Sequence, residues 1–250
     1  MDLYRDYFPT KAYKYAEMRM GRLLSSECDR LDGIAMALGR EYAIGPDNLR
    51  DQVPEILKFT EAYHAAYMQY LDAVLPQQPA PIQCRPACGN CCHHYPMSVE
   101  PFELVHLYAN LRKREDFISV MEACQFRSNL FDSLYEKRLE TVNSEDEAED
   151  KALHDYFAQW KSCPFSNKVG DCMVYAIRPV SCRMYFSETD PGFCKPETLL
   201  TEKNESFIVY LPDSAEEAIY RISEHFSGLE LPESYFGGLL AMNVYEGLFA

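Results

Sequence analysis

The sequence has no uncharged stretch that approaches the ~18 apolar residues of a membrane-spanning helix. Basic residues are also scarce, 24 against 39 acidic ones, which gives a formal net charge of −15. Such a surface repels a phosphate backbone, so we expect neither a membrane protein nor a nucleic-acid-binding one. The first residues, MDLYRDYFPT, are charged and lack the apolar core of a secretory signal. We therefore expect a cytoplasmic protein.

Several enzyme signatures are absent as well. The chain has only 11 glycines, and it contains no GxSxG motif, no P-loop and no GxGxxG after a strand. Apolar residues make up 47% and charged residues 25%, as in an ordinary globular protein with a sizeable core. Disulfides or metals are therefore not needed as its only source of stability, and a cysteine cluster is expected to serve chemistry or one local substructure.

Cysteine, by contrast, is abundant, with ten residues of which four lie in CRPACGNCC at 84–92. Cytosolic thiols are kept reduced, so this cluster favours metal binding or catalysis over disulfides. Cys28 and Cys124 fall on apolar helical stripes and are predicted to be core residues. The other eight are the predicted metal ligands: Cys84, Cys88, Cys91, Cys92, Cys163, Cys172, Cys182 and Cys194.

The short spacings within this cluster let thiolates converge on one ion at a small cost in loop-closure entropy. Pro86 and Gly89 suit the tight bends that this requires. Because Cys91 and Cys92 are neighbours, they do not easily point the same way, and one of them is a candidate for a different site. Eight thiols permit either two four-ligand sites or one site with reserve cysteines.

Soft thiolates select zinc, copper(I) or iron–sulfur clusters and reject calcium and magnesium. A site of four thiolates is negatively charged, and Arg85, Arg178 and Arg183 are either nearby groups that offset this charge or ordinary surface arginines. His93 and His94 directly follow the cluster and are further candidates. They are less favoured than the cysteines, whose number already exceeds the needs of one site.

The spacing Cys84-x3-Cys88-x2-Cys91 is also the one by which radical S-adenosylmethionine enzymes hold a 4Fe–4S cluster with one open iron. Those enzymes usually have an aromatic residue before the third cysteine, where this chain has Asn90, and the expected run of βα units is absent. Zinc sites more often show two well-separated C-x2-C pairs, which are absent too. We therefore favour an iron–sulfur cluster of the 4Fe–4S type, with zinc as the alternative.

Apolar residues repeat at helical spacing through most of the chain and predict a mainly α-helical fold. Helices are expected over 10–78 with a break at 43–48, where the Gly-Pro pair favours a turn. The Pro-rich stretch PQQPAPIQ at 76–83 predicts a boundary. We accordingly predict an N-terminal helical segment at 1–78, a cysteine-cluster metal-binding domain at 79–200, and a C-terminal helical segment at 201–250 that packs on it.

Local signals refine this outline. Ser98 is predicted to cap one helix, and Ser144 with Glu147 forms a capping box for another. Short strands are predicted at 173–175 and 207–211. The expected fold is a helical bundle-like scaffold around a loop-rich cysteine core, with at most a small β-hairpin.

Two motifs together resemble a known family. CRPACGNCC and the later CPFSNKVGDCMVYAIRPVSCR at 163–183 resemble the patterns CxxxCxxCC and CPF…C..Y..RP..CR of cysteine-cluster proteins described as zinc- or iron-chelating domains. The resemblance covers roughly 82–194 and implies metal binding by the cysteines. In the second motif, Tyr175, Arg178 and Arg183 match the family pattern and are candidate cofactor-binding residues.

One related group, the flagellin lysine methylases, shares this kind of cluster and is similar to enzymes that use an iron–sulfur centre with S-adenosylmethionine. By this analogy, a redox or S-adenosylmethionine-linked enzyme that modifies a protein substrate is one of three functional classes that remain open. The alternatives are a metal carrier or sensor, and a structural metal site that organises an interaction surface. An enzyme requires a pocket close to the metal, and a carrier requires exposed ligands. A structural site requires neither, because its zinc is buried and fully ligated.

Overall fold

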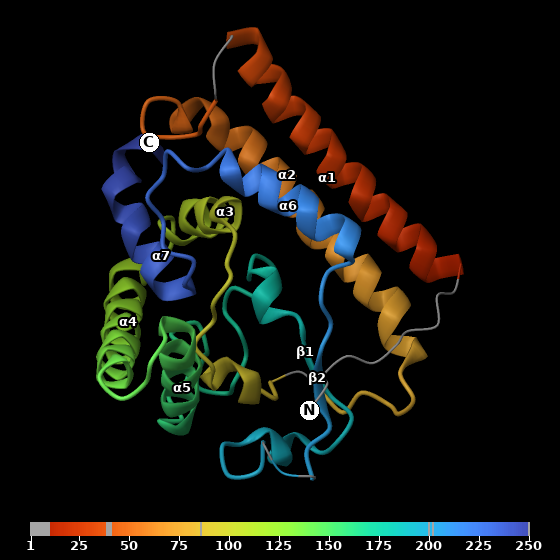
Figure 1. Cartoon of the computed structure of the whole chain (residues 1–250), viewed down its shortest axis with the longest axis vertical. Coiled ribbons are helices and arrows are strands. Elements are labelled where there is room, and N and C mark those ends of the chain that lie inside the picture. The colour runs from red at the N-terminus through yellow and green to blue at the C-terminus, as the bar shows by residue number, and fades with distance from the viewer. Residues whose placement is uncertain (1–10, 39–41, 86, 200, 202, 250) are drawn as a thin grey trace.

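The computed structural model describes residues 11–38, 42–85, 87–199, 201 and 203–249, so the predicted bend at Pro86 lies outside it. The described residues form seven α-helices and one two-stranded antiparallel sheet. Five short 3₁₀ segments, η1 to η5, connect or follow them. The prediction of a mainly α-helical fold with a very small β element is confirmed (Figure 1).

Three helices make one side of the molecule. α1 (Lys11–Leu38) packs against α2 (Leu49–Val74) and against α6 (Asp213–Glu224), which comes from the far end of the sequence (Figure 1). The predicted break lies between α1 and α2, where the Asn48 side chain accepts a hydrogen bond from the Gly45 backbone N–H at 2.9 Å. A Cβ on Gly228 would lie 2.7 Å from the Ile44 carbonyl oxygen, so the break packs closely against the chain that follows α6.

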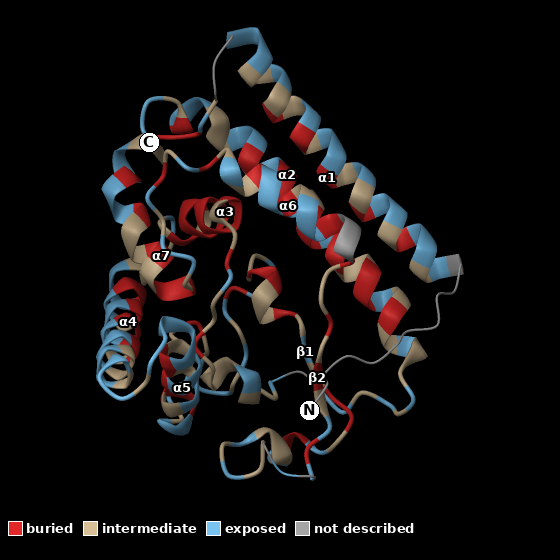
Figure 2. Cartoon of the chain, viewed as in Figure 1, coloured by how far each residue is buried: buried red, intermediate tan, exposed pale blue. Residues whose placement is uncertain are grey.

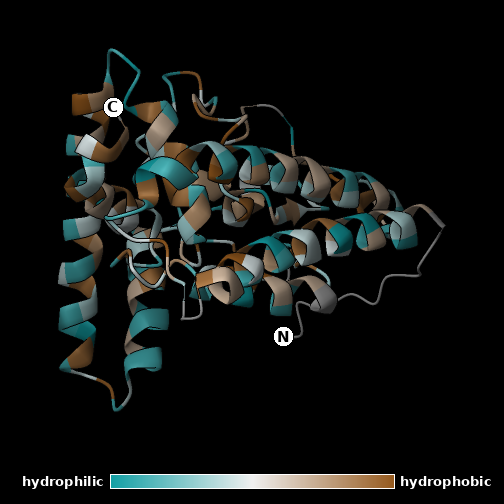
Figure 3. Ribbon diagram, turned by 90° about the horizontal axis from the view of Figure 1, so that it is seen from above, coloured by the Kyte–Doolittle hydropathy of each residue, from teal (hydrophilic) through white to brown (hydrophobic). Residues whose placement is uncertain are grey.

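The predicted apolar stripes form the core beneath these helices. On α2, Phe59, Tyr63, Tyr67 and Tyr70 are all buried, and burial of each such side chain contributes about 1.5–3 kcal/mol. On α1, burial extends from Ala16 through Leu31, whereas Leu38, the last residue of the helix, is half exposed. Figure 2 shows the buried residues on the inner faces, and Figure 3 shows hydrophilic residues on the outer sides of the long helices.

α3 (Pro101–Leu111) lies at the centre of the molecule and is buried almost all round (Figure 2). Its N-cap is Glu100, so the prediction of a cap at Ser98 is wrong. The chain stays extended beyond Ser98 because the Val99 N–H donates to the Glu233 carbonyl at 2.9 Å, which ties this segment to the C-terminal part of the chain.

α4 (Phe117–Leu139) and α5 (Glu145–Ala158) form an antiparallel pair. The predicted cap of α5 is confirmed, because the Glu147 N–H donates to the Ser144 hydroxyl at 3.2 Å. Arg138 and Asp155 join the two helices through two hydrogen bonds of 2.6 and 2.7 Å. α7 (Tyr235–Ala241) packs against both α3 and α4.

The small sheet pairs β1 (Tyr185–Ser187) with β2 (Ser206–Ile208), and Phe186 lies opposite Phe207. The predicted strand at 207–211 is therefore present but shorter. The strand predicted at 173–175 is wrong, because that segment is a chain of turns in which the Tyr175 N–H donates to the Cys172 carbonyl. The short 3₁₀ segments are η1 (Leu75–Gln77), η2 (Asn90–His93), η3 (Val180–Cys182), η4 (Pro191–Cys194) and η5 (Met242–Phe249).

Across the described ranges, none of the helices is both long enough and apolar enough to span a membrane.

Candidate metal centre

The two cysteine motifs, far apart in the sequence, meet in the folded chain. The contact is made by loop backbones: a Cβ on Gly170 would lie 2.9 Å from the Ala87 carbonyl oxygen, and one on Gly89 would lie 3.5 Å from the Gly170 carbonyl oxygen. Gly170 has φ +93° and Gly89 has φ +65°, a backbone region that glycine enters without strain. The glycines thus allow CRPACG and SNKVGD to dock directly on each other.

Five thiols from these motifs line one cavity of about 40 Å³ between the docked loops: Cys91, Cys92, Cys163, Cys172 and Cys182. Phe165, Val174 and Tyr235 also line it, so much of the wall is apolar. This volume is larger than the smallest space that can hold one water molecule. The structure brings both Cys91 and Cys92 to this one cavity, although they are neighbours in the chain.

Four of these thiols, those of Cys91, Cys163, Cys172 and Cys182, have a raised pKa in the metal-free protein. Burial raises the pKa of Cys163 to about 12 and raises the pKa of Cys172 and Cys182 as well. The pKa of Cys91 is also raised, by its hydrogen bond with Cys92 and then by burial. The positive charge of Arg178 acts against this rise. A metal bound here must therefore displace protons.

The other three predicted ligands lie outside the lining of this cavity. Burial of its thiol raises the pKa of Cys84 to about 11, and Cys91, Cys88 and Cys194 lie close enough for their charges to add to this rise. η2 packs against η4, which ends at Cys194. Cys91 therefore belongs to both thiol groups, the one in the cavity and the one beside it. All ten cysteines are free thiols.

Zinc or iron is the metal that the sequence implies, and the chemistry of the residues present fits a thiolate-bound group. Two hydroxyls that line the cavity, those of Tyr235 and Ser181, are buried without a hydrogen-bond partner among the described residues. Such a group costs about 1–3 kcal/mol, which a bound acceptor would offset. In the part of the chain that the structure describes, no three His, Cys, Asp or Glu side chains already converge on one metal position.

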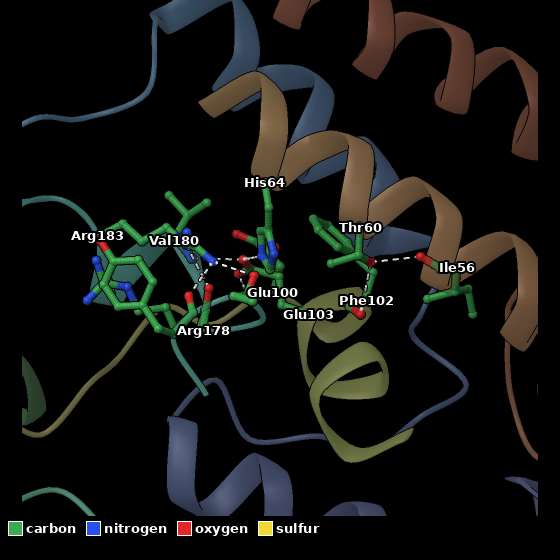
Figure 4. A network of polar contacts seen from close by, with 11 residues as sticks. Ile56, Thr60, His64, Glu100, Phe102, Glu103, Arg178, Val180 and Arg183 are labelled. Atoms are coloured by element: carbon green, nitrogen blue, oxygen red, sulfur yellow. Dashed lines mark hydrogen bonds and ion pairs between the residues drawn. The ribbon is translucent and has the colours of Figure 1, made fainter. Parts of the chain in front are cut away.

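The predicted cofactor-binding residues separate into two roles. Arg178 lines the cavity, whereas Arg183 is 5% exposed and donates to the backbone carbonyls of Tyr175, Ala176 and Arg178 at 2.9–3.2 Å (Figure 4). Arg183 therefore holds the turn that carries Arg178. The Tyr175 ring lies 4.1 Å from the Arg178 guanidinium carbon and outside the cavity lining. Arg85 is exposed.

The two histidines that follow the cluster are stacked on aromatic rings. His94 lines the cavity and stacks on Phe157 with a centroid distance of 3.9 Å. Burial lowers the pKa of His94 to about 4, so its imidazole is neutral at pH 7. His93 stacks on Trp160 at 3.8 Å.

A buried carboxylate connects the helical body to the cysteine loops, and sequence reasoning did not identify it. Glu103, on α3, is 1% exposed, and its Oε1 lies 2.8 Å from both His64 Nε2 and the Val180 backbone nitrogen (Figure 4). Val180 begins η3, which ends at Cys182. The only sequence signal was a glutamate in the first turn of a mostly apolar helix.

A larger groove of about 840 Å³ adjoins the cavity and shares His94, Ser181 and Tyr185 with it. Among the described residues that line the groove there is no Lys or Arg, and burial raises the pKa of one of its carboxyls, Glu100, to about 7. The acidic residues in the lining are Glu100, Glu103, Glu216, Glu224 and Glu233.

Comparison with known proteins gives one match. Residues 83–206 match the family CxxCxxCC, described as "Putative zinc- or iron-chelating domain". The matched segment contains all eight predicted ligand cysteines and excludes α1, α2, α6 and α7. No curated protein and no solved structure matches the chain significantly, and the similarity to flagellin lysine methylases stays a prediction.

Proposed function

We propose, on the premise that this chain belongs to the CxxCxxCC family through residues 83–206, that its clustered cysteines hold an iron–sulfur cluster of the 4Fe–4S type. The observation that carries the proposal is the single cavity lined by five thiols from two distant motifs. Zinc and iron both fit the family description, and both accept thiolate ligands.

The arrangement of the thiols supports a cluster over one zinc ion. A structural zinc gathers four ligands around one point, with Zn–S distances of about 2.3 Å. In an iron–sulfur cluster the cysteine thiolates bind different iron atoms. The ligands are therefore spread around the whole cluster and not around one ion. The five thiols come from η2, η3 and the turns at 163 and 172, and they surround a cavity in this way. Zinc in a structural or carrier module stays the alternative.

When bound, the cluster supplies one-electron redox chemistry. The other cavity residues set its surroundings. Arg178 carries the positive charge that offsets the thiolates, while Phe165 and Val174 limit the access of water. Low water access and nearby positive charge are both properties by which a protein sets the reduction potential of a cluster.

The test is to purify the protein without oxygen, record its visible spectrum, and count iron, zinc and sulfide per chain. We expect a coloured protein with iron and sulfide in equal amounts. The Cys182→Ser variant should lose the metal, whereas Cys28→Ser, which alters a buried core cysteine, should keep it. A colourless protein with stoichiometric zinc would contradict the cluster but not metal binding.

The adjoining groove favours a second candidate function, an enzyme that uses the cluster as cofactor. Its size lies within the range of small-molecule sites, and its five glutamates suit a ligand with positive charge. S-adenosylmethionine, with its sulfonium and ammonium groups, is such a ligand, and the reaction would be redox chemistry or modification of a protein substrate.

Equilibrium dialysis of the metal-loaded protein with S-adenosylmethionine tests this candidate. We expect binding that weakens at least tenfold in a Glu216→Gln/Glu233→Gln variant, because both carboxylates lie in the groove lining. Glu122→Gln is the matched control, since Glu122 is an exposed residue of α4 outside the groove. Equal binding by all three proteins would refute the groove as the site.

A further inference from the structure

One hydroxyl in the cysteine cavity comes from outside the family segment. Tyr235, the first residue of α7, is 1% exposed, and its ring lines the cavity together with the five thiols. Its hydroxyl has no hydrogen-bond partner within the described part of the chain. Buried polar groups in native proteins are almost always paired, so an unpaired one in a ligand cavity points to a missing acceptor.

The position of Tyr235 is closely constrained. Its backbone N–H donates to the Pro96 carbonyl at 3.0 Å, directly downstream of the first cysteine motif. Its ring packs between Phe165 and Phe236, each with a centroid distance of 5.3 Å. Because these contacts hold the ring in place, they also hold the position of its hydroxyl oxygen. The unpaired hydroxyl is therefore a fixed feature of the cavity wall.

The groups around this hydroxyl suggest its acceptor. The thiols of Cys163, Cys172 and Cys182 are close enough to Tyr235 to interact with it electrostatically. A protonated thiol is a weak acceptor, whereas a metal-bound thiolate or sulfide carries negative charge and accepts a stronger hydrogen bond.

We propose that the Tyr235 hydroxyl donates a hydrogen bond to a metal-bound sulfur in this cavity, so that the C-terminal helix α7 completes a site whose ligands lie within 83–206. The inference rests on the proposed metal binding. It gives α7 a role at the site beyond packing, and it makes Tyr235 a positioning and tuning residue rather than a ligand.

The expected effects follow from this hydrogen bond. Loss of an outer-shell partner of a metal ligand typically weakens metal binding about 10–100-fold. Hydrogen bonds to cluster sulfurs also stabilise the more negative, reduced state. The Tyr235→Phe variant should therefore bind metal 10–100-fold more weakly and, when it holds an iron–sulfur cluster, should have a more negative reduction potential than the wild type.

Thermal unfolding of the full-length protein, with and without metal, gives the sharpest test. In the metal-free protein, Tyr235→Phe removes an unpaired hydroxyl, and we expect an unfolding temperature equal to or above that of the wild type. In the loaded protein the order should reverse. Tyr108→Phe is the control, because that buried hydroxyl donates to Asn243 at 3.0 Å away from the cavity. It should lower both unfolding temperatures alike and leave metal affinity unchanged.

Metal affinity is measured by chelator competition with zinc and with iron plus sulfide, so the result does not depend on which metal is native. Unchanged affinity in Tyr235→Phe would overturn the inference while leaving the proposed function intact. An equal loss of stability with and without metal would also overturn it, because the hydroxyl would then have a structural partner. Failure of the wild type to bind either metal would overturn both proposals together.

Discussion

At the scale of single residues, the surroundings of each thiol decide what it can do. Cys28 and Cys124 are buried outside the lining of the five-thiol cavity, with exposed fractions of 3% and 0%, and their predicted role as core residues is confirmed. Cys163 is also inside the protein, but it shares a cavity with four other thiols. A cysteine buried in the core acts as a small hydrophobic residue, whereas one that lines a cavity with other thiols is a candidate metal ligand.

Serine replacements at Cys163 and Cys84 should therefore differ. Cys163→Ser removes one thiol from the five-thiol cavity and should abolish the proposed metal binding there. Cys84→Ser should leave most of the metal in place, because Cys84 lies outside the cavity lining, near Cys88, Cys91 and Cys194. Metal analysis of both variants after anaerobic purification checks this. Equal loss from both would mean that one site spans the two groups.

Glu100 should make stability depend on pH. Burial raises the pKa of this carboxyl from 4.5 to about 7, against the hydrogen bond from the Ser223 hydroxyl, which lowers it. The folded state therefore holds a proton that the unfolded chain releases, and this contribution, roughly 3 kcal/mol, is fully present below pH 4.5 and is lost as the pH rises through 7.

Denaturant unfolding at pH 5 and pH 8 measures this contribution. The wild type should lose stability between these values, and Glu100→Gln, which keeps a neutral side chain of the same shape, should lose less. An identical pH dependence in the two proteins would contradict the assignment to Glu100.

At the scale of elements, the cysteine loops depend on the helical body for their position. η3 is a single short turn with little stability of its own. Glu103 attaches it to the buried helix α3 through the Val180 N–H, and Arg183 holds the preceding turn by its carbonyls (Figure 4). A loop that is fixed at both ends in this way presents Cys182 to the cavity in one conformation.

Replacement of Glu103 should therefore damage the site as well as the fold. Glu103→Ala leaves the buried Val180 N–H unpaired, at a cost of about 1–3 kcal/mol, and frees η3. His64→Ala is the matched control, because it removes the other partner of Glu103 but keeps the bond to Val180. We expect similar destabilisation in urea for both variants but weaker metal binding only for Glu103→Ala. Equal metal affinities would contradict this role.

At the scale of the whole molecule, one contiguous core joins the three segments predicted from the sequence. It contains Tyr67 from the first segment, Phe102 and Tyr108 from the second, and Phe236 from the third. The family segment thus packs against helices from both ends of the chain, α2 and α7 (Figure 1). The site depends on how these parts bring the two cysteine motifs together.

The contact between the motifs should be sensitive to a single methyl group. In Gly170→Ala the new Cβ would lie 2.9 Å from the Ala87 carbonyl and would also disfavour the positive φ. The loops should move apart, and metal affinity should fall at least tenfold with the helical circular dichroism unchanged. Gly33→Ala, with nothing within 4 Å of the new Cβ in α1, should match or exceed wild-type stability and affinity. Normal metal binding by Gly170→Ala would show that close docking of the loops is not required.

The sequence by itself determined the helices, the apolar stripes and the thiol chemistry of the centre. These follow from periodicity and donor type, which are properties of residues close together in the chain. The errors arose where distant contacts override local signals, as at Ser98, where Val99 is held by Glu233, and at 173–175, where turns support the cavity. Only the tertiary structure decided which thiols share a cavity and which carboxylate and hydroxyl face the cysteine loops. Those groups come from separate elements, and packing alone brings them together.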